Sequence, residues 1–460
     1  MSIIKNMLIA KNYNEYISHY QKWYFISFKV LLVLVIPLGG ETFHAAVYLM
    51  LALWALRSSR HALESLSLVL IVSSLNPAIY QLSDLSTFLH WFVIICAFIT
   101  VALNQIFKSI KIPSAWVWLV VFVVIVALLS ILSSYAIDIS LFKLTSFFIG
   151  GTTILLGYHQ TKKYSKYWGM WFYFIFVVTV FFSFPLIILS PGYETNGTGF
   201  QGIFDQPQAY AIFLSPFITW LLVLLLSGRL IGLFHWLVLL SALASLILTE
   251  SRTGVFSLVL AFAFTIFWST LQTNKSKQIY NWRLIKIIPI IFIGLFLVIV
   301  QYEEIIGYTN KFINKRQNAH SLQSAYLISR GSLIESSIQD FYKEPAIGIG
   351  FGVASNPRHL KIHRDPWLGL PISASTEKGF ILTSILGETG LIGFIVFLLF
   401  LVNLYRPILT RHTDISAVGL SVSALLVNFG EAVFFSFGGM GLLIWLLIGF
   451  SRVMNVNTRS

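Results

Sequence analysis

The segment around Arg252 has the residue types expected of an anion-binding site. Glu250, Ser251, Arg252 and Thr253 stand between two long apolar runs, and Arg252 is placed to begin the second. The N-terminus of a helix already favours anions through its free N–H groups and its dipole. A guanidinium there can also hold a phosphate through two parallel hydrogen bonds. The alternative interpretation is a plain turn whose arginine reaches along the membrane surface.

A second arginine, Arg330, lies in the longest hydrophilic stretch of the chain, residues 301–376. It begins an amphipathic pattern over residues 330–341, which predicts a helix that Pro345 would end. A glycine-rich run at 348–352 follows. Its spacing is not that of a dinucleotide-binding loop and no strand is predicted before it, so we interpret it as a tight turn.

A candidate proton acceptor stands just before another long apolar run. Glu377 could take a proton from a hydroxyl group, and Lys378 beside it could contact a phosphate. An acid at a helix N-terminus can instead have a purely stabilising role. His363 is a rival base, although its basic neighbours in the sequence would lower its pKa through like-charge repulsion.

A fourth candidate segment, residues 202–208, precedes an apolar run. Gln206 is the candidate substrate contact there, but Pro207 in the first turn of a helix explains much of the pattern. The sequence has no His, Cys or carboxylate pattern typical of a metal site and no Walker loop. We therefore expect neither a metal nor any other cofactor.

A membrane protein must position these residues, because the composition excludes a soluble one. Of 460 residues, 57% are hydrophobic and only 11% are charged, whereas soluble domains carry about 25% charged residues. Apolar runs of about 20 residues can cross a bilayer as helices. The pattern predicts 14 such runs, with 12 as the alternative. The predicted fold class is all-α: a polytopic membrane protein with 12–14 transmembrane helices.

The net charge of +13 is an orientation signal rather than a nucleic-acid signal. Basic residues gather in alternate connecting segments, and the short segments between them carry mainly acids. By the positive-inside rule both termini are cytoplasmic and the long loop lies outside. Arg252 opposes this rule, since it is the only basic residue that the short outer segments hold. We expect no nucleic-acid partner.

Four further charges interrupt the apolar runs. Glu388 lies among Gly387, Gly390 and Gly393, and a straight span would bury its carboxylate at a cost of several kcal/mol. We therefore predict an outer helix near 376–387, a bend at the glycines and a span from about Leu391. Charges within the bilayer can also mark a transport path; the residues that would do so are Lys29, Lys143 and Glu431.

The chain is expected to divide into four parts. These are N-terminal transmembrane helices (1–200), helices that contain the Ser-Arg-Thr-Gly motif (201–301), the large outer loop (302–376) and C-terminal helices (377–460).

Taken in order, these features resemble the O-antigen ligase and Wzy-type polysaccharide polymerase superfamily over roughly residues 200–405. The resemblance implies a GT-C-like fold in the bacterial inner membrane with the large loop in the periplasm. It also implies a metal-independent glycosyltransferase whose donor is an undecaprenyl-pyrophosphate-linked glycan. The acceptor is another lipid-linked repeat in polymerases and the lipid A core in ligases. The lipid bilayer and a chain-length regulator are further candidate partners.

The resemblance also implies roles for individual residues. Arg252 and Arg330 would clamp the pyrophosphate and Glu377 would act as the base. The substrate contacts would be Ser251, Thr253, Gln206, Lys378 and His363. Many ligases have His-Asn where this chain has Glu377 and Lys378, which favours a polymerase. A ligase and a polysaccharide or small-solute transporter remain the alternatives.

Overall fold

The computed structural model describes residues 26–83, 85–193, 199–271, 322–357, 361–364, 371–375, 378–410 and 413–454. Within these ranges it confirms an all-α polytopic membrane protein. Seven of the described helices are long and apolar enough to cross a bilayer. They form because lipid offers no hydrogen bonds, so each backbone N–H and C=O must find its partner within the protein.

The helices before the outer loop are α2 (Glu41–Ala55), α3 (Ser59–Ser73), α4 (Ser86–Lys108), α5 (Ser114–Ser133), α6 (Ile137–Gln160), α7 (Ser165–Ser183), α8 (Pro207–Leu226), α9 (Leu233–Leu248) and α10 (Arg252–Leu271). The later elements are α14 (Leu322–Lys343), β1 (Lys361–Arg364), β2 (Pro371–Ser375), α15 (Ile381–Tyr405), α16 (Ile415–Leu426) and α17 (Gly441–Val453). Short 3₁₀ turns include η1 (Ile36–Gly39) and η6 (Val427–Phe429).

Two predicted spans near the C-terminus are shorter than expected. The runs at 413–429 and 434–451 contain α16, with 12 residues, and α17, with 13. At 1.5 Å per residue each helix is about 20 Å long, less than the roughly 30 Å of the hydrocarbon core. The irregular backbone at 430–440 joins them, and such backbone is tolerated at membrane depth only where protein or a cavity surrounds it. The predicted span at 284–301 lies outside the described residues.

Contacts between helix ends divide the bundle as the charge pattern predicts. At one end Ser59 Oγ donates to Gln160 Oε1 (2.5 Å), and Arg229 pairs with Asp414. All of these residues belong to segments assigned to the inside.

At the other end, the segments assigned to the outside contact one another. Asn76 N donates to Ile203 O (2.8 Å), and Phe200 N donates to Leu248 O (2.7 Å). We call this the outer end, defined by Asn76, Asp205 and Glu250. That it faces the periplasm remains a prediction.

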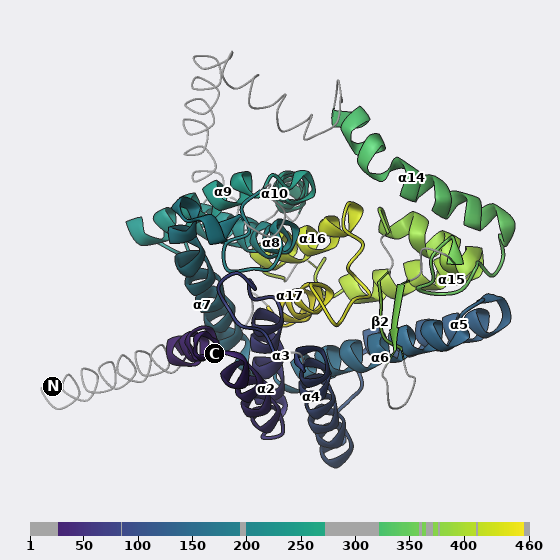
Figure 1. The fold of residues 1–460 in the computed structure, drawn as a ribbon, viewed down its shortest axis with the longest axis horizontal. Coiled ribbons are helices and arrows are strands. Elements are labelled where there is room, and N and C mark those ends of the chain that lie inside the picture. The colour runs from purple at the N-terminus through teal and green to yellow at the C-terminus, as the bar shows by residue number, and fades with distance from the viewer. Residues whose placement is uncertain are drawn as a thin grey trace, which may run out of the picture.

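The outer-loop residues that the structure describes lie against α15 and α6. Figure 1 shows α14 along α15, with α5 and α6 on the other side of α15. The predicted helix at 330–341 is confirmed as part of α14, which begins earlier and ends at Lys343. Strands β1 and β2 form a small antiparallel hairpin that the all-helical prediction did not include; it contacts α6.

Candidate active site

Arg252 begins α10 directly after a strained turn. Glu250 has a φ of 54°, a left-handed conformation that non-glycine residues seldom adopt. The buried Ser251 hydroxyl accepts a hydrogen bond from Gly254 N (3.3 Å), which is the geometry of a helix N-cap. The structure thus gives Ser251 a role in fixing the helix start at Arg252. Its role as a substrate contact remains a prediction.

The first turn of α10 packs against the segment after η6. A Cβ added to Gly430 would meet Thr253 Oγ1 at 2.2 Å, so Thr253 leaves room there only for a glycine. Glu431, the next residue, forms an ion pair with Arg330 of α14. Residues 427–431 therefore connect the helices that carry Arg252 and Arg330. We call this segment the junction.

Arg330 is enclosed at the junction rather than spread into solvent. Its side chain is 15% exposed and that of Glu431 is 22% exposed. The Cδ atom of Arg330 would lie 3.4 Å from a Cβ on Gly379. Arg330 therefore lies beside the residue that follows Lys378. Two elements of the predicted site, Arg330 and the segment starting at Lys378, are thus brought together.

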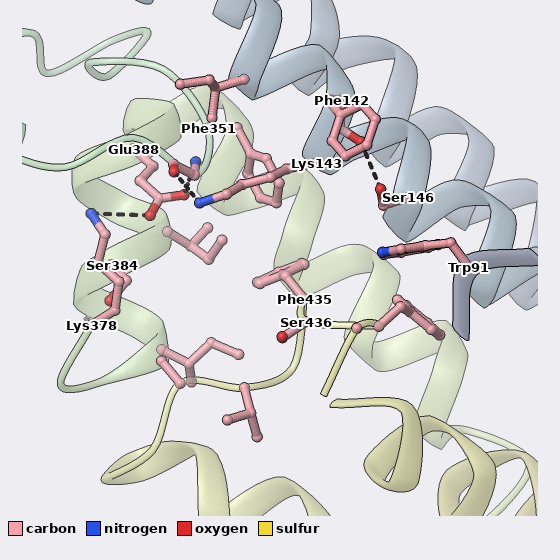
Figure 2. A pocket seen from close by; sticks show the side chains of 18 of the residues that line it. Trp91, Phe142, Lys143, Ser146, Phe351, Lys378, Ser384, Glu388, Phe435 and Ser436 are labelled. Carbon is pink, nitrogen blue, oxygen red and sulfur yellow. Dashed lines mark hydrogen bonds and ion pairs between the residues drawn. The ribbon is translucent and has the colours of Figure 1, made fainter. Parts of the chain in front are cut away.

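Lys378 pairs with Glu388 inside a small polar network (Figure 2). Lys378 Nζ lies 3.1 Å from Glu388 Oε1, and Gly352 N donates to Glu388 Oε2 (2.7 Å). Lys143 of α6 also contacts this network, because its Nζ donates to Gly352 O (2.5 Å). Glu388 is only 6% exposed. A buried carboxylate needs such partners, because an unpaired charge in the interior is strongly unfavourable.

The predicted break in α15 positions Glu388. Gly390 has φ 60° and ψ −168°, which interrupts the helix and confirms a bend at this glycine. The turn after α14 supplies the hydrogen bonds that the break leaves open: Gly350 N donates to Glu388 O (2.9 Å), and Leu391 N donates to Pro345 O (2.9 Å). The glycine-rich run is therefore a structural turn, as predicted, and it docks on the broken helix.

The segment at 202–208 lies at the outer end beside the start of α10. A Cβ on Gly199 would meet Thr249 O at 2.6 Å and Pro207 Cβ at 3.3 Å, which joins this segment to the turn before Arg252. Gln206 is exposed, and Pro207 occupies the first turn of α8 as predicted. Burial raises the pKa of Asp205 to about 6, despite hydrogen bonds from backbone N–H groups that lower it.

Both candidate bases lie outside the side chains that the structure describes. Glu377 lies outside the described residues. The backbone of His363 lies in β1, where it pairs with Ser373 of β2. The roles of both as candidate bases remain predictions.

The sequence prediction did not assign Glu388, Glu431 or Lys143 to the catalytic site. All three were visible as charges within apolar runs, and such charges need partners. Lys143 and Glu431, together with Lys29, also carried the transport interpretation. In the structure Lys29 pairs with Glu64 (2.8 Å), and Lys143 and Glu431 have the partners given above. Among the described residues, no three His, Cys, Asp or Glu side chains gather as a metal site would require.

A comparison with protein families shows which family part of this chain resembles. Residues 236–398 match the family model Wzy_C, described as O-antigen ligase. This segment is similar to the O-antigen ligase domain family. The match contains Arg252, Arg330, Lys378 and Glu388. No curated protein matches the chain.

The matching family belongs to lipopolysaccharide biosynthesis and, at the family level, implies glycosyltransferase activity on lipid-linked glycans. The matched segment ends before the junction and does not include α4 or α6. Glu431 and Lys143 therefore lie outside the matched segment and contact residues within it.

Proposed function

We propose that the protein is a membrane glycosyltransferase that polymerises undecaprenyl-pyrophosphate-linked oligosaccharide repeat units. The reaction takes place at the periplasmic face of the bacterial inner membrane and needs no metal. The observation that carries this proposal is the junction, where the first turn of α10 and the ion pair of Arg330 with Glu431 meet.

The charge at this end of the bundle suits a diphosphate. The arginines at the junction are Arg252 at the start of α10 and Arg330 on α14, which pairs with Glu431. A pyrophosphate diester carries two negative charges, and two guanidinium groups can bind them. Two unit charges 4 Å apart interact by roughly 4 kcal/mol at an effective dielectric constant of 20. Arginines are suited to this task because their fork geometry matches phosphate oxygens.

In the proposed reaction an acceptor hydroxyl oxygen attacks the anomeric carbon of the donor sugar. The bond from that carbon to the pyrophosphate oxygen breaks, and undecaprenyl pyrophosphate leaves with the electron pair. Arg252 and Arg330 stabilise the negative charge that develops on the leaving group. Glu377 accepts the hydroxyl proton. Ser251, Thr253, Gln206, Lys378 and His363 are the proposed substrate contacts.

Polymerisation is favoured over ligation by Glu377 and Lys378, which stand where many ligases have His-Asn. The second candidate is a ligase that transfers the glycan to the lipid A core, and the description of the matching family favours it. A chain-length regulator is the proposed protein partner of the polymerase.

Reconstitution of the purified protein with a lipid-linked repeat distinguishes these functions. A ladder of products with increasing numbers of repeats supports the polymerase. Transfer that occurs only after lipid A core is added would assign a ligase. Translocation of the donor without formation of a new glycosidic bond would overturn the proposal in favour of a transporter.

A further inference from the structure

A cavity of about 500 Å³ opens beside the junction at the outer end of the bundle. Its walls come from the beginning of α4, residues 139–146 of α6, the glycine turn at 351–352, Lys378 with the outer part of α15, and the irregular segment at 432–438. Neither Arg252 nor Arg330 lines it. Its volume lies within the range typical of small-molecule sites, about 300–1,000 Å³.

One side of the cavity is charged and the other is aromatic (Figure 2). Lys143, Lys378 and Glu388 form the charged side. Trp91 and Phe435 lie on the aromatic side. Hydroxyl groups also line the cavity; they belong to Thr87, Ser146, Ser384 and Ser436.

We propose that this cavity binds the saccharide of the glycan acceptor. The inference rests on the proposed glycosyltransferase function and adds the location of the second substrate. A sugar ring has apolar C–H faces that can lie on aromatic side chains, and hydroxyl groups at its edge that can bond to carboxylate, ammonium and serine groups. The cavity presents both kinds of surface across a single space.

The lining argues against the main alternative occupant, the polyprenyl chain of the donor. A hydrocarbon chain would cover the lysines, the carboxylate and the serine hydroxyls without offering them hydrogen bonds, and removing polar groups from water in this way costs free energy. The polyprenyl chain also has the lipid phase itself as a favourable environment. The polar groups in this mixed lining therefore favour a ligand that makes hydrogen bonds as well as apolar contacts.

The position of the cavity suits an acceptor that must meet the donor. Ala432 lines the cavity, and its neighbour Glu431 pairs with Arg330. Lys378 lines the cavity as well, and Gly379 after it lies against Arg330. The cavity and the proposed pyrophosphate site thus share a wall. A hydroxyl group at that wall would lie next to the anomeric carbon of a donor held by the arginines.

The first test fills the cavity and compares it with a matched change one residue away. Ser146 lines the cavity, whereas Thr145 is exposed on the same helix; each hydroxyl bonds only to a backbone carbonyl of α6. We expect Ser146→Phe to raise KM for the acceptor at least severalfold with an unchanged dissociation constant for undecaprenyl pyrophosphate. Thr145→Phe should change neither. A weaker affinity for undecaprenyl pyrophosphate in Ser146→Phe alone would overturn the inference.

The second test does not depend on turnover. In Ser146→Cys the new thiol lies in the cavity, and the single native cysteine, Cys96, is buried. The repeat-unit oligosaccharide released by mild acid from the cell's own lipid-linked donor should slow alkylation of this thiol severalfold. It should leave a thiol at Thr145→Cys unaffected. Protection by undecaprenyl phosphate and none by the oligosaccharide would assign the cavity to the lipid chain and overturn the proposal.

The two tests separate this inference from the proposed function. Protection by the oligosaccharide in a protein that forms no glycosidic bond would leave a saccharide site in a protein that is not a glycosyltransferase. Polymer formation without any protection would leave the enzyme and remove the acceptor site.

Discussion

Arg330 and Lys378 each lie beside a carboxylate contributed by another segment, Glu431 and Glu388 respectively. These pairs hold the cations in place in surroundings where an unpaired charge would be costly. An anionic ligand that enters can take over part of the role of each carboxylate. This end of the bundle is therefore a cationic site in which the carboxylates position the cations for an anionic ligand.

The proposed base gives the first prediction at this scale. Glu377→Gln keeps the size of the side chain but removes the proton acceptor, so it should abolish turnover while leaving donor binding intact. Product formation and binding of undecaprenyl pyrophosphate measure the two effects separately. If His363→Ala is the inactive variant and Glu377→Gln is active, the base has been assigned to the wrong residue.

Asp205 gives a prediction about pH. Burial raises its pKa from an ordinary value near 3.8 to about 6. Between these values the folded protein keeps a proton that the unfolded chain has released, so this contribution to stability is lost as pH rises from about 4 to about 6. Above pH 6 we expect Asp205→Asn to raise the free energy of unfolding, by at most about 3 kcal/mol at roughly 1.4 kcal/mol per pKa unit.

The measurement for Asp205 is thermal unfolding in detergent at a series of pH values. The difference in Tm between Asp205→Asn and the unmodified protein should be largest above pH 6 and should shrink toward pH 4. A difference that does not vary with pH would show that the carboxyl group of Asp205 has an ordinary pKa.

At the scale of elements, the broken helix α15 shows how much could be predicted. Three glycines around a single carboxylate were enough to place the bend, because a straight span would have buried Glu388 without partners. The hydrogen bonds that the turn at 345–350 supplies to the break could not be predicted. They join segments about 40 residues apart, and no local pattern in the sequence reports that contact.

The same limit applies to the end of the chain. The runs at 413–429 and 434–451 have the composition of full spans, and only their packing reveals that α16 and α17 are short. The segment between these two helices contains the junction and one wall of the cavity. Glu431 was the one signal in the sequence, since it is a charge within an otherwise apolar region.

The docking of the glycine turn gives a prediction at this scale. Gly348 has a φ of 71°, and a Cβ there would meet Glu388 C at 2.4 Å. Gly348→Ala should therefore lower the free energy of unfolding by at least about 1–2 kcal/mol and reduce activity by moving Glu388. Gly169→Ala is the matched control, because the nearest atom that its Cβ would meet outside its own helix is Phe450 Cζ at 3.9 Å. Equal Tm values for the two variants in detergent would contradict the docking.

At the scale of the whole molecule, the charge pattern predicted which helix ends lie together. Contacts of Asn76 with Ile203 and of Phe200 with Leu248 group the segments assigned to the outside. Such grouping follows from alternate crossings of a bilayer, which a single sequence can report through its basic residues. Which residues face one another across the bundle depends on packing that composition does not encode.

The orientation gives a prediction for the whole molecule. We expect a cysteine at Glu250 to react with a membrane-impermeant thiol reagent added to intact spheroplasts. A cysteine at Arg229, at the opposite end, should react only after the membrane is permeabilised. The reverse pattern would place the proposed site in the cytoplasm, where a periplasmic polymerase could not use it.

The most direct test of the account is the effect of Arg252→Lys on donor binding and polymer formation. Lysine keeps the charge but cannot form the two parallel hydrogen bonds of a guanidinium. We therefore expect weaker binding of undecaprenyl pyrophosphate and a loss of activity on the order of a hundredfold, at normal expression. Arg229→Lys is the control, because Arg229 pairs with Asp414 at the opposite end of the bundle. Normal donor affinity and normal polymer length in Arg252→Lys would contradict the pyrophosphate clamp.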